Sequence, residues 1–143
     1  MEVIGIGNAG HEMCKLFREK GYEAYSIDTN KDAFIKFPKV KTIEEAEKFQ
    51  INLHPLIEKI KSDHILCVMA GSGIVTGSCL KILENFKNKK IDFLYIQPDL
   101  SFMNSLGKKR EVMVRSILQE FARSGLFNKM WMVSNKSISN LSS

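Results

Sequence analysis

Short apolar runs alternate along this chain with segments in which apolar residues recur at helical spacing. The runs at residues 2–6, 22–28, 65–69, 91–97 and 129–133 each predict a strand, and a short third strand is expected around Val40. Helices are expected at residues 11–20, 42–49, 55–61, 80–86 and 108–124. Strands that alternate with helices in this way predict an α/β fold, a mostly parallel sheet with helices on both faces and right-handed crossovers.

The helical spacing also indicates which side chains should be buried. The expected inward residues are Met13, Leu16 and Phe17 in the first helix, Leu56, Ile57 and Ile60 in the third, and Val114, Ile117, Leu118 and Phe121 in the last. Four methionines in the second half of the chain are expected in or near the core: Met103, Met113, Met130 and Met132.

The first expected strand leads directly into a glycine-rich turn, residues 5–10, with the pattern GxGxxG. A helix follows it, and the second strand closes with Asp28. This βαβ context makes GxGxxG informative, because the pattern fits a dinucleotide such as NAD, whose ribose hydroxyls the acid would bind.

A second turn of small and hydroxyl-bearing residues, 70–78, lies between the fourth expected strand and the next helix. Unpaired backbone N–H groups and the positive end of the dipole at a helix start suit a phosphate group. Ser72, Thr76 and Ser78 could add hydrogen bonds from their hydroxyls. Alternatively, Gly71 and Gly73 merely allow a sharp turn and close helix packing.

The two glycine turns should meet if the sheet is doubly wound. In the Rossmann-like strand order 3-2-1-4-5-6, the first and fourth strands are neighbours where the winding reverses, and ligands bind at their carboxyl ends. Glycine turns at both of these ends predict a nucleotide site.

Five segments, in the right order, resemble motifs of the tubulin and FtsZ family of GTP-binding proteins. They are residues 4–10, 27–30, 70–78, 101–110 and 133–136, which are similar to the family's first nucleotide loop, its Asn-Thr-Asp, its GGGTGTG phosphate loop, its Ser-Phe-Glu-Gly-basic-basic-Arg run and its Pro-Asn-Asp. The resemblance spans nearly the whole chain and implies a GTP- or GDP-binding domain that acts in filament or assembly formation.

The resemblance also implies roles for particular residues. The nucleotide-binding set is Gly7, Asn8, Ala9, Gly10, Gly71, Ser72, Gly73, Thr76, Gly77, Ser78, Arg110 and Asn135. In this set the first four approach the α and β phosphates, and the members from Gly73 to Ser78 wrap the phosphates. Arg110 lies near the ribose and Asn135 near the guanine edge. Mg²⁺ is expected to accompany a bound triphosphate.

The chain also departs from the family. Ile74 and Val75 stand where the family has glycines, and β-branched residues adopt positive φ only at a cost. Glu12 replaces a guanine-binding asparagine and Leu106 a ribose-binding glutamate, and residues 23–70 contain no glycine to build the family's γ-phosphate loop. We assign no catalytic or metal-ligating residue. GTPase activity is expected only if another segment or subunit supplies the catalytic acid.

Two alternatives to a GTP-binding domain therefore stay open. One is a degenerate tubulin-like assembly module without nucleotide binding, which Ile74 and Val75 favour. The other is a small NAD-binding Rossmann protein, which rests on GxGxxG and Asp28.

The chain's composition limits its class and its partners. With 143 residues and 44% apolar content, we expect one domain over residues 1–133 and a Ser/Asn-rich tail, or the start of a further helix, over residues 134–143. The net charge of +5 is spread along the chain without an arginine-rich arm, which argues against nucleic acid as the main partner. The family resemblance implies self-association or another assembly subunit as the partner.

Location is predicted from cysteine usage and hydropathy. Three widely spaced cysteines suit reduced, buried thiols. The start MEVIGIG does not resemble a signal peptide, and no apolar run approaches the ~20 residues that span a bilayer. We expect a cytoplasmic protein.

Overall fold

The computed structural model describes residues 1–39, 43–48, 50–70, 78–99, 101 and 103–134. The described strands are β1 (Glu2–Ile6), β2 (Ala24–Asp28), β3 (Ile35–Lys36), β4 (His64–Ala70), β5 (Lys90–Gln97) and β6 (Lys129–Ser134). The described helices are α1 (Gly7–Glu19), α2 (Ile43–Lys48), α3 (His54–Lys59), α4 (Cys79–Glu84) and α5 (Ser105–Arg123).

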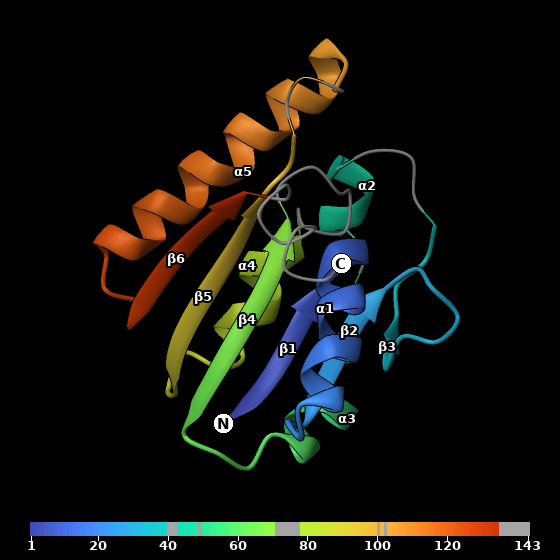
Figure 1. Cartoon of the computed structure of the whole chain (residues 1–143), viewed down its shortest axis with the longest axis vertical. Helices are drawn as coiled ribbons and strands as arrows, with labels where there is room; N and C mark the ends of the chain where they lie inside the picture. The colour runs from blue at the N-terminus through green and yellow to red at the C-terminus, as the bar shows by residue number, and fades with distance from the viewer. Residues whose placement is uncertain (40–42, 49, 71–77, 100, 102, 135–143) are drawn as a thin grey trace.

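The strands form one six-stranded sheet in the order β3-β2-β1-β4-β5-β6, and every neighbouring pair is parallel (Figure 1). The predicted doubly wound order is therefore confirmed. The central strand β1 pairs with β2 on one side and with β4 on the other, with Ile6 opposite both Ile27 and Met69. The winding reverses between β1 and β4, as the sequence predicted.

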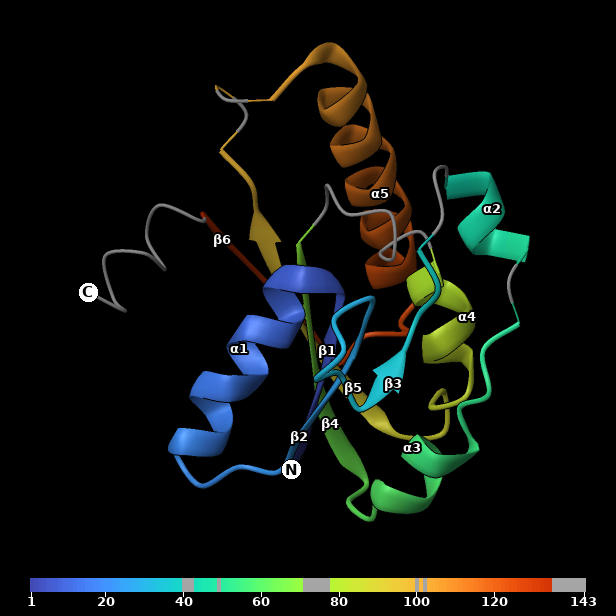
Figure 2. The same ribbon diagram turned by 90° about the vertical axis from the view of Figure 1, so that its right-hand side faces the viewer.

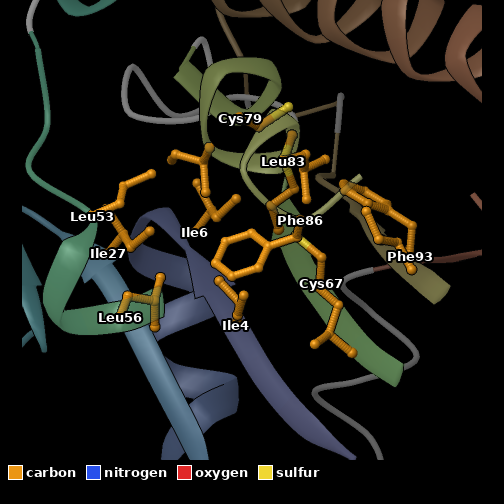
Figure 3. Close-up of a cluster of buried hydrophobic side chains, with 14 of the residues drawn as sticks. Ile4, Ile6, Ile27, Leu53, Leu56, Cys67, Cys79, Leu83, Phe86 and Phe93 are labelled. Atoms are coloured by element: carbon orange, nitrogen blue, oxygen red, sulfur yellow. The ribbon is translucent and has the colours of Figure 1, made fainter. Parts of the chain in front are cut away.

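The two faces of the sheet are covered unequally (Figure 2). α1 covers one face, where Val3, Cys14, Ala24, Leu66, Val68 and Ile96 form a small buried cluster. The opposite face carries α3, α4 and α5 and the larger cluster, shown in part in Figure 3. Alternate residues of β1 supply both clusters, because successive side chains of a strand point to opposite faces. The predicted helices on both faces are confirmed.

Some element boundaries differ from the predictions. α1 begins at Gly7, four residues before the expected start, because the turn glycines themselves form its first turn. β2 begins at Ala24 and not at residue 22. The third strand is Ile35–Lys36, whereas the predicted position around Val40 lies outside the described residues.

Several predicted core positions were wrong. Leu16, Ile57 and Ile117 are 39%, 41% and 37% exposed, and Met113 and Met132 are also exposed. In α1 the buried positions are Gly7, Gly10, His11 and Cys14, and in α5 they are Glu111, Val114 and Leu118. Both helices therefore turn a different face to the core than the apolar periodicity predicted. His11 in α1 and Glu111 in α5 are buried, whereas polar residues were expected on the exposed face.

Polar groups at the amino end of the sheet are tied together by side-chain hydrogen bonds. The Glu2 carboxylate accepts from the backbone N–H groups of Lys61 (2.9 Å) and Ser62 (3.2 Å). Asp92 lies 2.5 Å from the His64 ring (Oδ2 to Nε2) and accepts from the Asn128 amide at 3.0 Å. These contacts join the start of β1 to the segment before β4, and the start of β5 to β4 and to the segment before β6.

Candidate functional site at the carboxyl end of the sheet

The candidate site is the point where β1 and β4 end side by side. β1 passes into α1 without an intervening loop, so the first turn of α1 lies at the carboxyl end of β1 (Figure 1). β4 ends at Ala70, and the glycine turn that follows it, residues 71–77, lies outside the described residues. The predicted site residues Gly71, Ser72, Gly73, Thr76 and Gly77, and also Asn135, therefore have no described position.

The three glycines of GxGxxG have separate structural roles. Gly7 has φ +80, which places it in the left-handed region that favours glycine. A Cβ on Gly5 would lie 2.2 Å from the Gly10 carbonyl oxygen, and a Cβ on Gly10 would lie 2.6 Å from the Val68 carbonyl oxygen. Gly5 and Gly10 therefore let α1 pack directly on β1 and β4, while Gly7 makes the turn from strand to helix.

Within α1 and its N-cap residue, no side chain compensates the positive end of the helix dipole. Its N-cap residue, Ile6, is extended and makes no side-chain cap hydrogen bond, and its first turn holds no acidic residue. Asn8 is exposed and Ala9 is half-buried, whereas Gly7 and Gly10 are buried. The first N–H groups of a helix lack intrahelical partners, so this end of α1 can accept an anion.

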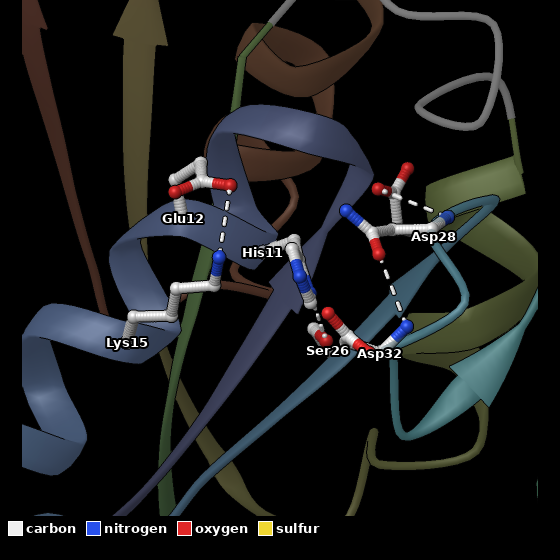
Figure 4. A network of polar contacts seen from close by, with 7 residues as sticks. His11, Glu12, Lys15, Ser26, Asp28 and Asp32 are labelled. Atoms are coloured by element: carbon white, nitrogen blue, oxygen red, sulfur yellow. Dashed lines mark hydrogen bonds and ion pairs between the residues drawn. The ribbon is translucent and has the colours of Figure 1, made fainter.

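His11 extends the site toward β2 (Figure 4). Its Nδ1 lies 2.7 Å from the Ser26 hydroxyl, and both side chains are buried. The other ring nitrogen, Nε2, is buried without a hydrogen-bond partner. No functional role was predicted for His11 from the sequence. The register that sets Gly5 of β1 opposite Ser26 of β2 is the signal that could have revealed the pair.

Asp28 ends β2 close to this pair (Figure 4). Its side chain accepts weakly from the Asn30 N–H at 3.4 Å, and the residue is only 4% exposed. Asn30 in turn accepts from the Asp32 N–H at 3.0 Å, which fixes the turn after β2. The Asp28 carboxylate is thus largely covered, which counts against the ribose-binding role expected of it in a dinucleotide site.

Glu12 lies on the exposed side of α1. By the sequence resemblance, it stands where the tubulin and FtsZ family has a guanine-binding asparagine. Its carboxylate is 3.4 Å from the Lys15 ammonium group, and both side chains are about half exposed, at 54% and 47% (Figure 4). An exposed pair of this kind contributes little to stability. Glu12 therefore leaves the buried part of the site unaffected.

On the other face of the sheet, a buried polar group lies between β5 and α5. The Tyr95 hydroxyl donates to Glu111 at 2.8 Å, and the Arg115 guanidinium is 3.4 Å from the same carboxylate oxygen. The second oxygen of Glu111 is buried without a partner. Burial and the hydrogen bond to Glu111 raise the pKa of Tyr95, so its hydroxyl stays protonated and donating. Sequence reasoning missed Glu111.

The structure places two further predicted site residues. Ser78 is buried at the N-cap position of α4. Arg110 is half-buried on α5, next to Glu111. The described residues thus bring the first four predicted residues, from Gly7 to Gly10, together at one helix end, while Ser78 and Arg110 lie on elements that cover the opposite face.

A separate hollow of about 560 Å³ lies at the other end of α1, away from the glycine turns. It is lined by Arg18, Gly21, Tyr22, Glu23, Ala24, Tyr25, Asp32 and Phe34. Sequence reasoning did not predict it, because its walls come from the end of a helix, the start of β2 and the loop after β2. None of the predicted nucleotide-binding residues that have a described position lines this hollow.

A scan of protein-family models finds no match to the chain, and a search of curated proteins finds no similar sequence. Among the described helices, none has both the length and the apolar character that crossing a bilayer requires. Within the same part of the chain, no three or more His, Cys, Asp or Glu side chains are grouped so that they could hold a metal ion.

Proposed function

We propose that this chain is a guanine-nucleotide-binding domain of tubulin/FtsZ type that acts in filament or assembly formation. The observation that carries the proposal is the uncapped N-terminus of α1, opened by Gly7 at the point where the winding of the sheet reverses. A doubly wound sheet binds ligands at this point, and a helix end without a side-chain cap suits a phosphate group.

The residues of α1 fit such a ligand. The backbone N–H groups of Asn8 and Ala9 would bind phosphate oxygens, and the buried Gly10 would hold the helix against β1 and β4. From the sequence resemblance, residues 71–78 would complete the phosphate cradle, with Arg110 toward the ribose and Asn135 toward guanine. A bound Mg²⁺ ion would neutralise part of the phosphate charge.

Hydrolysis is not expected of this chain alone. The resemblance assigns no residue here to the family's water-activating acid, and backbone N–H groups stabilise charge without activating water. In the proposed function, nucleotide binding prepares the chain for assembly, and any GTPase activity requires an acid from another segment or subunit.

The second candidate function is an assembly module that has lost nucleotide binding. Ile74 and Val75 favour it, because branched side chains bring bulk and backbone restriction to a phosphate loop. A NAD-binding protein is a third candidate, which the burial of Asp28 disfavours.

Thermal unfolding with GTP, GDP, ATP and NAD, each with Mg²⁺, separates these candidates. A ligand at one hundred times its Kd stabilises the folded state by about 2.7 kcal/mol, which is a measurable rise in Tm. A rise with GTP or GDP alone supports the proposal, and a rise with NAD alone supports the third candidate. No rise with any of the four contradicts nucleotide binding and leaves the assembly module.

The variant Asn8→Asp tests the assigned position. An acid in the first turn of α1 favours the helix dipole, so the free protein should keep its Tm, while the new charge repels phosphate. The GTP-dependent rise in Tm should then disappear. Gln119→Glu, on the exposed side of α5, introduces the same amide-to-acid change elsewhere and should keep the rise. A full rise in Asn8→Asp would contradict phosphate binding at α1.

A further inference from the structure

Among the described residues, the edge strand β6 has a neighbouring strand on one side only. The sheet has two edges, β3 and β6, and β3 is only two residues long. β6 has six residues, KMWMVS, contains no proline and carries a single charge, on Lys129. Among the described residues β6 pairs only with β5. Edge strands of soluble proteins are normally shortened, charged or covered, because their free N–H and C=O groups attract other strands.

Two large apolar side chains project from β6 on opposite faces. Trp131 is 45% exposed and stands opposite Leu94 of β5, which packs with the cluster on the α1 face. Met132 is 44% exposed and stands opposite Tyr95, which belongs to the cluster on the α5 face. An incoming strand would therefore cover apolar surface on both sides of the sheet.

The helix on this side of the sheet, α5, is predominantly basic. α5 packs on the β5–β6 side of the sheet, and Met130 of β6 contacts the cluster that includes its buried residues (Figure 1). The exposed or half-exposed charges of α5 are Lys108, Lys109, Arg110, Arg115, Glu120 and Arg123, so five are basic and one is acidic. The second acid of α5, Glu111, is buried against Tyr95.

We infer that the edge of β6 is a docking site for an extended segment of another protein in which acidic and apolar residues alternate. Added as a seventh strand, such a segment pairs its backbone with β6. Alternation directs its acids toward the basic helix α5 and its apolar residues toward Trp131 on the other face. A second copy of this chain fits less well, because pairing β6 with itself brings two basic α5 helices together.

Docking at β6 does not depend on nucleotide binding, and it can be measured by a separate fluorescence signal. Trp131 is the only tryptophan of the chain, so its fluorescence reports directly on this edge. The probes are two eight-residue peptides, one alternating Glu with Val and the other alternating Lys with Val. The Glu-Val peptide should shift Trp131 emission to shorter wavelength in a saturable way and should slow hydrogen exchange of β6 amides.

Two substitutions at one position test the electrostatic part of the site. Met132→Glu, on the α5 face, should weaken binding of the Glu-Val peptide at least tenfold, whereas Met132→Lys should leave it unchanged or tighten it. Ile57→Glu, at a 41% exposed position on α3, is the remote control and should bind like the parent chain. Higher salt should weaken binding in all the variants that bind.

Three results would overturn the inference. They are no shift of Trp131 emission with the Glu-Val peptide at millimolar concentration, equal binding of the two peptides, and equal binding by Met132→Glu and Met132→Lys. Sedimentation at increasing protein concentration supplies a further test. A dimer that Met132→Glu and Met132→Lys both disrupt would assign the edge to a second copy of this chain and would also overturn the inference.

Discussion

The two ends of the sheet are built differently. At the amino end, buried or half-buried polar groups have partners: Glu2 accepts two backbone N–H groups, and Asp92 bridges His64 and Asn128. At the carboxyl end, His11 and Glu111 each keep one buried polar atom without a partner. Of the helices that start there, α1 has no side-chain cap, whereas the Asn104 side chain caps α5 by accepting from the Gly107 N–H.

The two ends therefore have different expected roles: the amino end contributes to stability, and the carboxyl end is the one expected to bind a ligand. A buried polar group without a partner costs free energy, whereas a satisfied group contributes modestly to stability. Among the described residues, the two buried polar atoms without a partner lie toward the carboxyl end, where a bound group could offset their cost. In this chain, that end is also the one that the topology assigns to ligands.

The largest expected effect comes from Gly10→Ala. The added Cβ would meet the Val68 carbonyl oxygen at 2.6 Å and the Gly5 carbonyl carbon at 2.8 Å, and neither backbone atom can rotate away. We expect unfolding in urea to show a loss of about 3 kcal/mol or more. Gly107→Ala is the matched control, because its Cβ meets the end of the flexible Met103 side chain at 2.9 Å. Equal effects of the two substitutions would contradict the close packing of α1.

A smaller effect should distinguish the two ends directly. Asp92→Asn retains the side-chain shape but faces donors on both sides, so we expect a loss of about 1.5 kcal/mol. Glu111→Gln keeps an acceptor for the Tyr95 hydroxyl but removes the charge that Arg115 faces at 3.4 Å and buries an amide N–H group. Removal of an incompletely paired buried carboxylate offsets part of this cost, so we expect a smaller loss, about 0.5–1 kcal/mol. Urea unfolding of both variants at neutral pH measures the difference. A larger loss for Glu111→Gln would refute the contrast between the ends.

A further effect, confined to alkaline pH, is a gradual loss of stability caused by the buried thiols. Burial raises the pKa of Cys14 from 9.0 to about 11 and that of Cys79 to about 12, and burial also raises the pKa of Cys67 well above 9.0. Above pH 9 the unfolded chain releases protons that the folded chain retains. Stability should therefore fall as pH rises, by about 1.4 kcal/mol per pH unit for each thiol until its folded pKa is reached.

Urea unfolding between pH 8 and pH 11 measures this slope, and two variants locate its source. Cys79→Ala should reduce the slope by one thiol's share. Asp92→Asn, which changes only the amino end, should shift stability without changing the slope. A slope in Cys79→Ala identical to that of the parent chain would exclude the buried Cys79 thiol as a source.

The sequence predicted the fold better than the site. Apolar runs and glycine turns gave the strand order, because each strand is short, buried and followed by a recognisable break. The predicted start of α1 was four residues too late, because the glycines were interpreted as a loop. In the structure, Gly5 and Gly10 lie where α1 packs closely on the strands. His11 and Glu111 were missed because polar residues on an amphipathic helix read as exposed. Their partners, Ser26 and Tyr95, become visible only with the register and the helix rotation.

The central place of β1 has a consequence for how the chain folds during synthesis. β1 is made first, yet Glu2 pairs with Ile65 and Ile6 with Met69, so one side of β1 has no partner until β4 has left the ribosome. Until then the βαβ unit of β1, α1 and β2 has an unpaired apolar strand edge. Contacts so distant in sequence slow folding and expose intermediates to aggregation. We therefore expect early release of the nascent chain before residue 70 to yield an insoluble product, and later release to yield a foldable one.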